Sequence, residues 1–566
     1  MLLRADRAIL GAGKLSSLRA HTDAVRQADH TVRVRAIVFS LCGLLAASAP
    51  AVAQDDHAGH SIGESTFGRV HFATSCSPAV QESFDRAVAM LHSFFYPETE
   101  KAFRAVVDQD PHCAMGYWGL AISQRPNPLT APFPPALLKL GWENIEKARA
   151  MNPPTPRERD WIDAMATFFQ DFDTIDQRTR SARYESAMAR LHDRYPDDSE
   201  AAIFYALSLL EAVDLMDKTY AKQLKAAALL EALQNAQPEH PGIPHYLIHS
   251  YDYAPIATRG LPAARRYAAL ATSAPHALHM PSHTFSTLGM WQDAIKSNLA
   301  ADAANRAYFA TTIPTAAANP ASIVARYHAL DFLVNAYLQL GLDGLAKGVV
   351  DELAPVQALP PTASITAHTG LAAVPVRYAL DRSAWQEAAS LAPRPSPFRQ
   401  AEAIIWFGKA LGAARTGDVA AAKQALAEIA SRREQLAAAG EPYWADQVGI
   451  QEMAASAWIA LADQRKSEAI ALMSSAADRE DRSEKSVAME NRLSPMRELL
   501  GELLLQAGRP KDALAEFERS LEAVPNRRRS LNGAAEAAEK SGNRRLAETY
   551  RQRWTAQRVT SLPPAP

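Results

Sequence analysis

Two short stretches of the sequence hold histidines at spacings that suit metal binding. The first is HPGIPHYLIHSYD and the second, further along the chain, is PHALHMPSH. Histidines four positions apart on a helix project their imidazoles from the same side, one turn apart, and so can hold one ion together. Two such pairs occur here, His245 with His249 and His279 with His283.

A divalent transition metal is the cofactor that these side chains favour. Imidazole combined with carboxylate suits Zn²⁺, Cu²⁺, Ni²⁺ or non-haem Fe²⁺, and the ligand types alone do not select among them. Neither stretch contains cysteine. This absence argues against a copper site built from thiolates and against an iron–sulfur cluster.

Two other roles for the histidines stay open on the sequence alone. Each imidazole could instead hydrogen-bond a carbonyl of a neighbouring helix or loop and help a curved stack of helices to close. The histidines could also perform acid–base catalysis without a metal. Familiar catalytic motifs give an enzyme no support, since the chain has no HExxH, no GxSxG and no glycine-rich phosphate loop after a strand.

Helices must position these residues, because the pattern beyond residue 75 is almost wholly helical. Ala, Leu, Glu and Arg dominate, and apolar residues recur at intervals of three and four. The helical stretches come in pairs, and several of the pairs are joined at a glycine turn. The clearest pair, PMRELLGELLLQAGRPKDALAEFERSLEAVP, has Gly501 in its first helix, a turn at Gly508 and Ala513 in its second helix.

This pair resembles the tetratricopeptide repeat (TPR), a helix pair of about 34 residues whose copies stack into a superhelix. Weaker copies lie at residues 96–123, 283–303, 327–353 and 406–429. The resemblance implies an all-α fold, a right-handed superhelical solenoid of TPR-like helix pairs over most of residues 78–553. Such solenoids mostly serve as binding surfaces, so the resemblance also implies a protein or peptide partner.

The histidines repeat in phase when the repeats are aligned on their turn glycines. Thirteen, ten and six residues before Gly289 stand His276, His279 and His283. The same offsets before Gly341 give His328, Asp331 and Asn335, and HYLIH of the earlier stretch aligns with HMPSH of the later one.

By resemblance, this face of each first helix lines the concave groove of the superhelix. We therefore expect one histidine-rich groove, with the following metal ligands: His245, His249, Asp252, His276, His279, His283, His328 and Asp331. Proline inside a helix removes a hydrogen-bond donor and collides with the preceding turn. If the helix begins only at Met280 or Pro281, His276 and His279 leave the assigned face.

Composition shifts divide the chain into segments. Residues 354–372 and 311–320 are rich in Pro, Ala and Thr and are predicted to be loops. The predicted organisation is a pre-sequence and secretory signal peptide at 1–53, a polar tail at 54–77, an N-terminal TPR-like array with the histidine groove at 78–353, a linker at 354–372, and a C-terminal TPR-like array and tail at 373–566.

The signal peptide predicts export. RVRAIVFSLCGLLAASAPAVA, residues 33–53, combines two arginines, a short apolar run and a small-x-small ending at Ala53. The apolar run is shorter than the roughly 20 residues that cross a bilayer, so we expect a periplasmic or secreted protein without a stable membrane anchor. In an oxidising compartment Cys76 and Cys113 favour a disulfide, although two buried free thiols are the alternative.

The bulk composition is that of a folded protein that does not bind nucleic acid. Hydrophobic residues make up 48% of the 566 residues, enough for a sizeable core. Sixty basic side chains against 62 acidic ones give a net charge of −2, without the basic excess that phosphate backbones require.

These patterns favour an exported TPR-like solenoid that acts as a protein- or peptide-binding scaffold, with a histidine-rich concave groove able to bind a divalent transition metal. The alternative is a metal-dependent hydrolase or oxidoreductase with its active site in that groove. Whether the chain is an enzyme stays open on its sequence.

Overall fold

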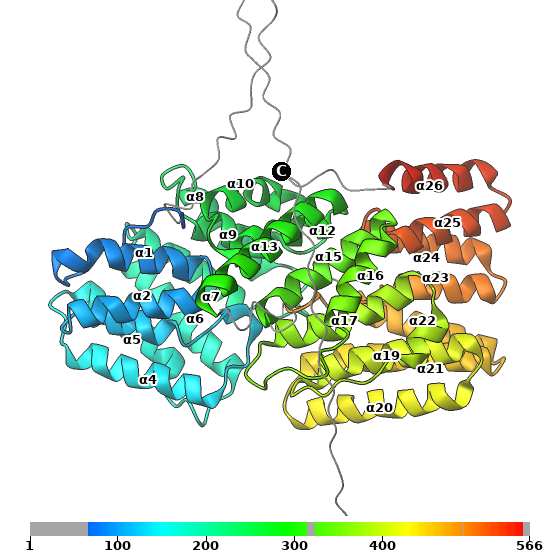
Figure 1. Ribbon diagram of the computed structural model, residues 1–566, viewed down its shortest axis with the longest axis horizontal. Coiled ribbons are helices and arrows are strands. Elements are labelled where there is room, and N and C mark those ends of the chain that lie inside the picture. The colour runs from blue at the N-terminus through cyan, green and yellow to red at the C-terminus, as the bar shows by residue number, and fades with distance from the viewer. Residues whose placement is uncertain (1–65, 314–322, 491, 559–566) are drawn as a thin grey trace, which may run out of the picture. The chain divides into compact units, whose positions relative to one another are not determined.

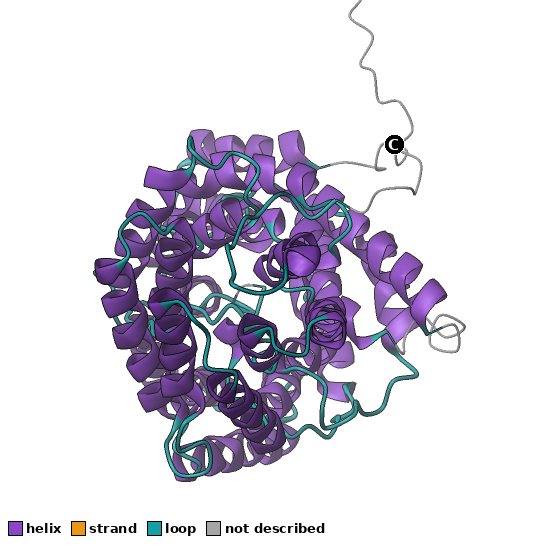
Figure 2. Ribbon diagram, turned by 90° about the vertical axis from the view of Figure 1, so that its left-hand side faces the viewer, coloured by secondary structure: helices purple, strands orange, loops and turns teal. Residues whose placement is uncertain are grey.

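The computed structural model describes residues 66–313, 323–490 and 492–558, and every regular element in these ranges is a helix (Figure 2). The predicted pre-sequence and signal peptide, and residues 54–65 of the predicted polar tail, lie outside the described residues. Residues 62–566 form one compact unit. The predicted all-α fold of TPR-like helix pairs is therefore confirmed.

The first part of the described chain is a run of mostly short helices, in which each helix packs against its neighbours in the chain (Figure 1). These helices are α1 (Gln81–His92), α2 (Tyr96–Gln109), α3 (Ala114–Ile122), α4 (Pro135–Ala150), α5 (Pro156–Phe169), α6 (Gln177–Arg194), α7 (Ser199–Glu211), α8 (Ala221–Leu233), α9 (Gly242–Tyr251), α10 (Leu261–Leu270), α11 (Pro275–His279), α12 (Pro281–Thr287), α13 (Trp291–Thr312), α15 (Tyr327–Leu340) and α16 (Asp343–Leu353).

The second part is more regular, with longer helices in its middle. Its helices are α17 (Ile365–Asp381), α18 (Trp385–Ser390), α19 (Arg399–Thr416), α20 (Val419–Ala438), α21 (Pro442–Ala462), α22 (Lys466–Glu480), α23 (Met496–Gln506), α24 (Pro510–Ala523), α25 (Arg528–Lys540) and α26 (Arg544–Gln557).

Glycine turns join the helix pairs that the sequence indicates. Gly289, Gly341, Gly417 and Gly508 have φ values of +67°, +78°, +85° and +84°, and each lies between the two helices of a predicted pair. Glycine adopts this left-handed conformation without the steric cost that a Cβ brings, which is why it so often ends a helix.

The core consists of two hydrophobic clusters that share one helix. One cluster runs mainly from Phe67 to Tyr378 and the other from Ile365 to Tyr550, so α17 contributes side chains to both. This helix begins at Ile365, within the segment 354–372 that the sequence predicts to be a linker. The Ser364 hydroxyl accepts a hydrogen bond from the Ala367 amide and caps the helix.

The last helices contact the repeat that carries the second histidine stretch. The Trp291 indole donates a hydrogen bond to the Asn526 carbonyl at 3.1 Å. The Arg528 amide donates to the Gln339 side chain at 2.8 Å, which ties the start of α25 to α15. Segments far apart in the sequence are thus held side by side.

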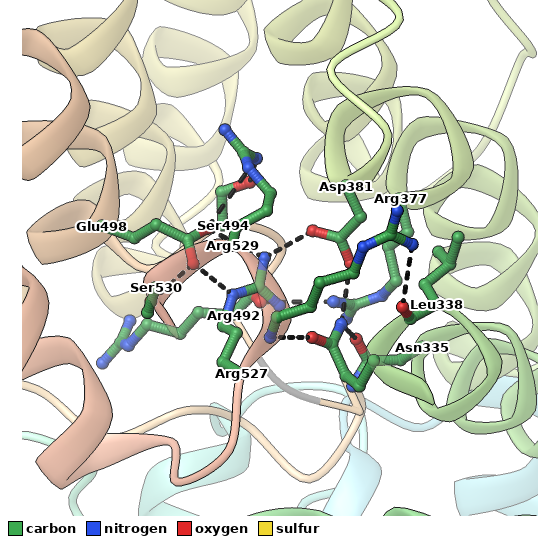
Figure 3. A network of polar contacts seen from close by, with 12 residues as sticks. Asn335, Leu338, Arg377, Asp381, Arg492, Ser494, Glu498, Arg527, Arg529 and Ser530 are labelled. Atoms are coloured by element: carbon green, nitrogen blue, oxygen red, sulfur yellow. Dashed lines mark hydrogen bonds and ion pairs between the residues drawn. The ribbon is translucent and has the colours of Figure 1, made fainter. Parts of the chain in front are cut away.

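A buried polar network strengthens this contact (Figure 3). Asp381 of α17 accepts hydrogen bonds from Arg527 at 2.6 Å and from Gln339 at 2.9 Å. Arg527 also binds the Glu498 carboxylate, so one guanidinium joins α17 to α23. Because every charge here has an opposite partner, the network can be buried without leaving an uncompensated ion.

None of the helices within the described ranges has both the length and the apolar character that a membrane span needs.

Candidate metal centre

Four helices bring the predicted histidines together. His245 and His249 lie on α9, His279 ends α11, and α12 and α15 supply one histidine each. Met280 keeps right-handed helical angles between α11 and α12, and its amide still donates to the His276 carbonyl. Pro281 occupies the first turn of α12, where its missing donor costs little, so His279 and His283 keep the relation of neighbours one turn apart.

The histidines form two groups, each of which could hold a metal ion. The first trio is His279, His283 and His328, and the second trio is His245, His249 and His276. Within each trio, one nitrogen from each ring lies within 4.8 Å of the other two.

Hydrogen bonds fix which nitrogen carries the proton in the first trio. The Asn298 amide nitrogen donates to the Ala294 carbonyl, so its oxygen faces His279 Nδ1 at 2.7 Å. His279 Nδ1 must therefore donate. His283 Nδ1 likewise donates to the Asp252 carboxylate at 2.9 Å.

As a result, two nitrogen lone pairs point at each other. His279 Nε2 and His283 Nε2 are 3.2 Å apart, and in the neutral tautomers that their Nδ1 hydrogen bonds select neither Nε2 carries a proton. Burial lowers the pKa of His279 to about 4, and burial followed by the neighbouring His279 lowers the pKa of His283 well below its ordinary value. Both rings are thus neutral near pH 7, and a cation between them would bind both lone pairs.

His328 supplies the third imidazole of this group. Its Nδ1 is buried and has no hydrogen-bond partner within the described part of the chain. Burial, followed by His279 and His283, lowers the pKa of His328 well below its ordinary value. Phe332 packs against all three rings, with centroid distances of 4.8, 4.8 and 5.1 Å, and forms an apolar wall.

Asp252 contacts the first trio through the distal nitrogen of His283. Besides His283, its carboxylate accepts hydrogen bonds from the Thr287 hydroxyl at 3.0 Å and from the Lys485 ammonium at 2.8 Å. A carboxylate that accepts the distal N–H of a metal-binding imidazole orients the ring and makes it a better ligand. The sequence predicts Asp252 as a metal ligand. In the structure its carboxylate is instead placed to orient the ligand His283.

Asp331, also predicted as a ligand, does not join either trio. Its oxygens lie 2.7 and 3.4 Å from the Arg377 guanidinium, and this buried ion pair occupies the carboxylate. The repeat alignment correctly indicates a buried polar residue at position 331. The partner of this residue, however, is Arg377 on the neighbouring helix α17.

The trios follow the repeat. Each contains a pair of histidines four residues apart and one histidine from the next first helix: His245 and His249 with His276, then His279 and His283 with His328. His276 and His328 hold equivalent positions in the alignment on turn glycines. The stacking of repeats, one step along the solenoid, therefore generates two similar sites.

A third group of histidines is held by hydrogen bonds alone. His92 Nε2 and His240 Nε2 donate to the two oxygens of the buried Glu200, at 3.0 and 2.8 Å. The other nitrogens accept from the Tyr246 hydroxyl and the Gly242 amide. Every ring nitrogen is satisfied, so this group fits the structural role that the sequence left open.

Cys76 and Cys113 form the expected disulfide, with an S–S distance of 2.03 Å. Their sulfur atoms are therefore not available to a metal.

Four residues that shape this region were not among the predicted ligands. They are His92, Glu200, Asn298 and Lys485. His92 lies on α1 and Lys485 follows α22, so neither belongs to the repeat that carries the histidine stretches. Only Asn298 could have been found from the local sequence, because it lies on α13, the helix that is paired with the histidine-bearing α12.

Fold and site together define an all-helical repeat protein with TPR-like helix pairs and a histidine-lined interior. No protein-family model matches the chain. No curated protein matches it either.

Several solved structures are similar at low identity. The human IFIT1 dimer with m7Gppp-AAAA is 11% identical over 78% of this chain and 90% of its own, with a TM-score of 0.32. Yeast Tom70 is 12% identical over 84% and 99%, with a TM-score of 0.30, and the P58(IPK) TPR domain is 12% identical over 82% and 98%, with a TM-score of 0.19. At these values the likeness carries nothing about what this chain binds.

Proposed function

We propose that this protein binds a divalent transition-metal ion in the first trio, within a TPR-like solenoid that serves as the frame of the site. The observation that carries the proposal is the 3.2 Å approach of His279 Nε2 to His283 Nε2, two atoms that either a proton or a metal ion must join. The lowered pKa of both rings disfavours the extra proton and so favours a metal ion. His328 would be the third ligand. Zn²⁺, Cu²⁺, Ni²⁺ and Fe²⁺ all suit imidazole.

The surroundings of the trio support a built metal site. His279 is 3% exposed and His283 is 2% exposed, so both imidazoles are enclosed by protein as those of a built site are. Asn298 and Asp252 hold the distal nitrogens of both rings, as the outer partners of metal-binding histidines commonly do. Three protein ligands also leave a fourth position for a small molecule.

Burial argues against a peptide-binding role for these histidines. A protein or peptide partner needs an accessible surface, and the imidazoles of His245, His279 and His283 are almost fully enclosed. We infer that the histidines serve the metal, and that a partner, where one binds, uses the outer surface of the array.

A metal-dependent enzyme is the second candidate, and one observation favours it. A cavity of about 380 Å³ is lined in part by Asp252, Thr287 and Lys485. These are the carboxylate that holds His283 and the two side chains that donate hydrogen bonds to it. A small polar substrate in this cavity would lie next to the supporting carboxylate of the trio. Its lining mixes lysine and arginine with aspartate and glutamate, so the cavity suits a polar substrate better than an apolar one.

We further propose that the chain is exported, as its signal sequence predicts. The Cys76–Cys113 disulfide supports an oxidising compartment.

Metal analysis tests the central proposal. The full chain is purified without chelators, its metal content is measured by mass spectrometry, and Co²⁺ is titrated into the metal-free protein, because the visible bands of Co²⁺ report ligand number and geometry. We expect at least one equivalent of metal and a tetrahedral Co²⁺ spectrum, and in the His279→Ala/His283→Ala double variant the loss of that spectrum and of the equivalent held by the first trio. His112→Ala, which removes an exposed histidine, is the matched control. Wild-type protein that is isolated without metal and takes up none of the candidate ions would overturn the proposal.

A further inference from the structure

The second trio presents several buried imidazole nitrogens that no hydrogen bond within the described residues satisfies. His245 Nδ1 donates to the His92 carbonyl at 2.6 Å, which leaves Nε2 as a buried lone pair without a partner among the described residues. Both nitrogens of His249 and the Nε2 of His276 are also buried and unpartnered there. Each buried polar atom without a partner destabilises the fold, so their convergence calls for a ligand.

The rings of the second trio are packed to meet at one point. The centroid of the His245 ring lies 5.0 Å from that of His249 and 5.1 Å from that of His276. One nitrogen from each ring lies within 4.8 Å of the other two. Three neutral imidazoles that converge in this way make a trigonal site for a transition metal.

Phe94 plays the same part here as Phe332 plays in the first trio. Its ring lies 4.4, 5.4 and 6.3 Å from those of His245, His276 and His249. The Phe94 backbone has φ of +52°, a conformation that costs free energy for a bulky residue and that persists where packing around a site imposes it. The turn after α1 thus places both an apolar wall and the His92 carbonyl against the second trio.

The two trios are contiguous. The His249 ring lies 5.8 Å from that of His283, and the His276 ring lies 6.1 Å from that of His279. The ligands are all imidazoles, which bind a metal in their neutral form, and Asp252, the carboxylate that contacts His283, is paired with Lys485. Four positive charges from two divalent ions would therefore be buried with little compensation, whereas two Cu⁺ ions bring half that charge.

We propose that the second trio holds a second ion beside the first, so that the six histidines form a centre of two adjacent metal ions. The first trio alone takes a divalent ion, whereas filling both trios at once favours the monovalent Cu⁺ because of its lower charge. This inference rests on the proposed function, since the first trio must bind as well. The ion in the first trio binds more tightly, because Asp252 supports that trio alone. Mutual repulsion makes the second ion bind more weakly.

Copper titration tests the pair. Cu⁺ is added without oxygen to the metal-free full chain in competition with a chromophoric chelator, and the number of bound equivalents is counted. We expect the wild type to bind two equivalents of Cu⁺. His249→Ala should keep only the tighter equivalent, in the first trio, and His328→Ala should keep only the weaker one, in the second trio. His276→Ala repeats the test at a partly exposed position, and circular dichroism verifies that each variant is folded.

The outcomes separate the two proposals. One equivalent in the wild type that persists in His249→Ala and His276→Ala overturns the second site and leaves the first standing. Two equivalents that neither of these substitutions changes also overturn the second site, because the second ion then lies elsewhere. A wild-type protein that binds no copper, Co²⁺ or Zn²⁺ overturns both.

Discussion

His283 Nδ1 donates to Asp252 at 2.9 Å, and the same carboxylate oxygen receives the Lys485 ammonium at 2.8 Å. The orientation of one imidazole in the first trio therefore depends on a lysine that is 202 residues further along the chain. Asp252→Asn keeps the size of the side chain but removes its charge. Because such outer partners contribute about 10- to 100-fold to metal affinity, we expect Co²⁺ binding to weaken by that factor. Competition titration measures it, with His112→Ala as the unaffected control; equal affinities would show that the carboxylate does not support the site.

Metal binding should stabilise the folded protein. An ion that binds the native state alone, at about 100 times its dissociation constant, adds about 2.7 kcal/mol to the free energy of unfolding. We expect Zn²⁺ to raise the melting temperature of the wild type and to leave that of His279→Ala/His283→Ala unchanged. Calorimetry with and without a chelator makes the comparison. A Zn²⁺ shift of the same size in the double variant would place the stabilising ion outside the first trio.

The disulfide should contribute substantially to stability. Cys76 and Cys113 are separated by 37 residues, and closing a loop of about that length stabilises a fold by roughly 3 to 4 kcal/mol in the loop-entropy account. Cys76→Ser leaves the Cys113 sulfur, which accepts a hydrogen bond from the Gly116 amide at the start of α3. Urea unfolding should reveal the loss, and a reducing agent should lower the stability of the wild type but not of the variant.

Glu490 should make stability depend on pH. Burial raises the pKa of this carboxyl to about 7, although the nearby Arg377 opposes the change. Between about pH 4.5 and 7 the folded state therefore holds more protons than the unfolded state, so the contribution of Glu490 to stability falls as the pH rises through this window. Relative to Glu490→Gln, which keeps an acceptor for Asn335, the wild type should lose up to about 3 kcal/mol from pH 5 to 8. Parallel stability curves for the two proteins would contradict this.

A side chain at Gly289 should destabilise the protein more than a side chain at an open turn does. A Cβ there would lie 2.2 Å from the Pro525 carbonyl, in addition to the cost of its positive φ. Gly417 is a matched control, since it has φ of +85° and a Cβ added there would meet no atom of the described residues within 4 Å. We expect Gly417→Ala to cost about 1 kcal/mol and Gly289→Ala at least about 1 kcal/mol more. Chemical denaturation of both variants gives the difference, and equal losses would mean that the backbone at Pro525 moves aside freely.

Repeat periodicity predicts much of this molecule, because a residue's offset from a turn glycine determines which face of the first helix it occupies. That rule correctly brings His279 and His283 together and places His328 beside them. It also selects Asp331, and there it misses the Arg377 partner, because an offset says nothing about the side chains of the next helix.

The sequence could not predict which distant segments contact the histidines, because an offset within a repeat describes only local structure. Lys485 and the Phe94 wall meet the histidines only after the chain has folded back on itself, and no local pattern records such a meeting. The division into two trios depends on the distances between stacked helices, which the sequence alone does not give.

The hydrogen bond from Trp291 to the Asn526 carbonyl joins two segments that are synthesised at different times. A polypeptide is made from its N-terminus, so all six histidines of the two trios emerge from the ribosome long before Lys485 and Asn526 exist. Until those later residues arrive, Asp252 lacks its lysine and the repeat at Gly289 lacks its docking surface. The proposed metal centre is therefore complete only when the later part of the chain has folded against it, so we expect metal to load onto the completed protein rather than onto the growing one.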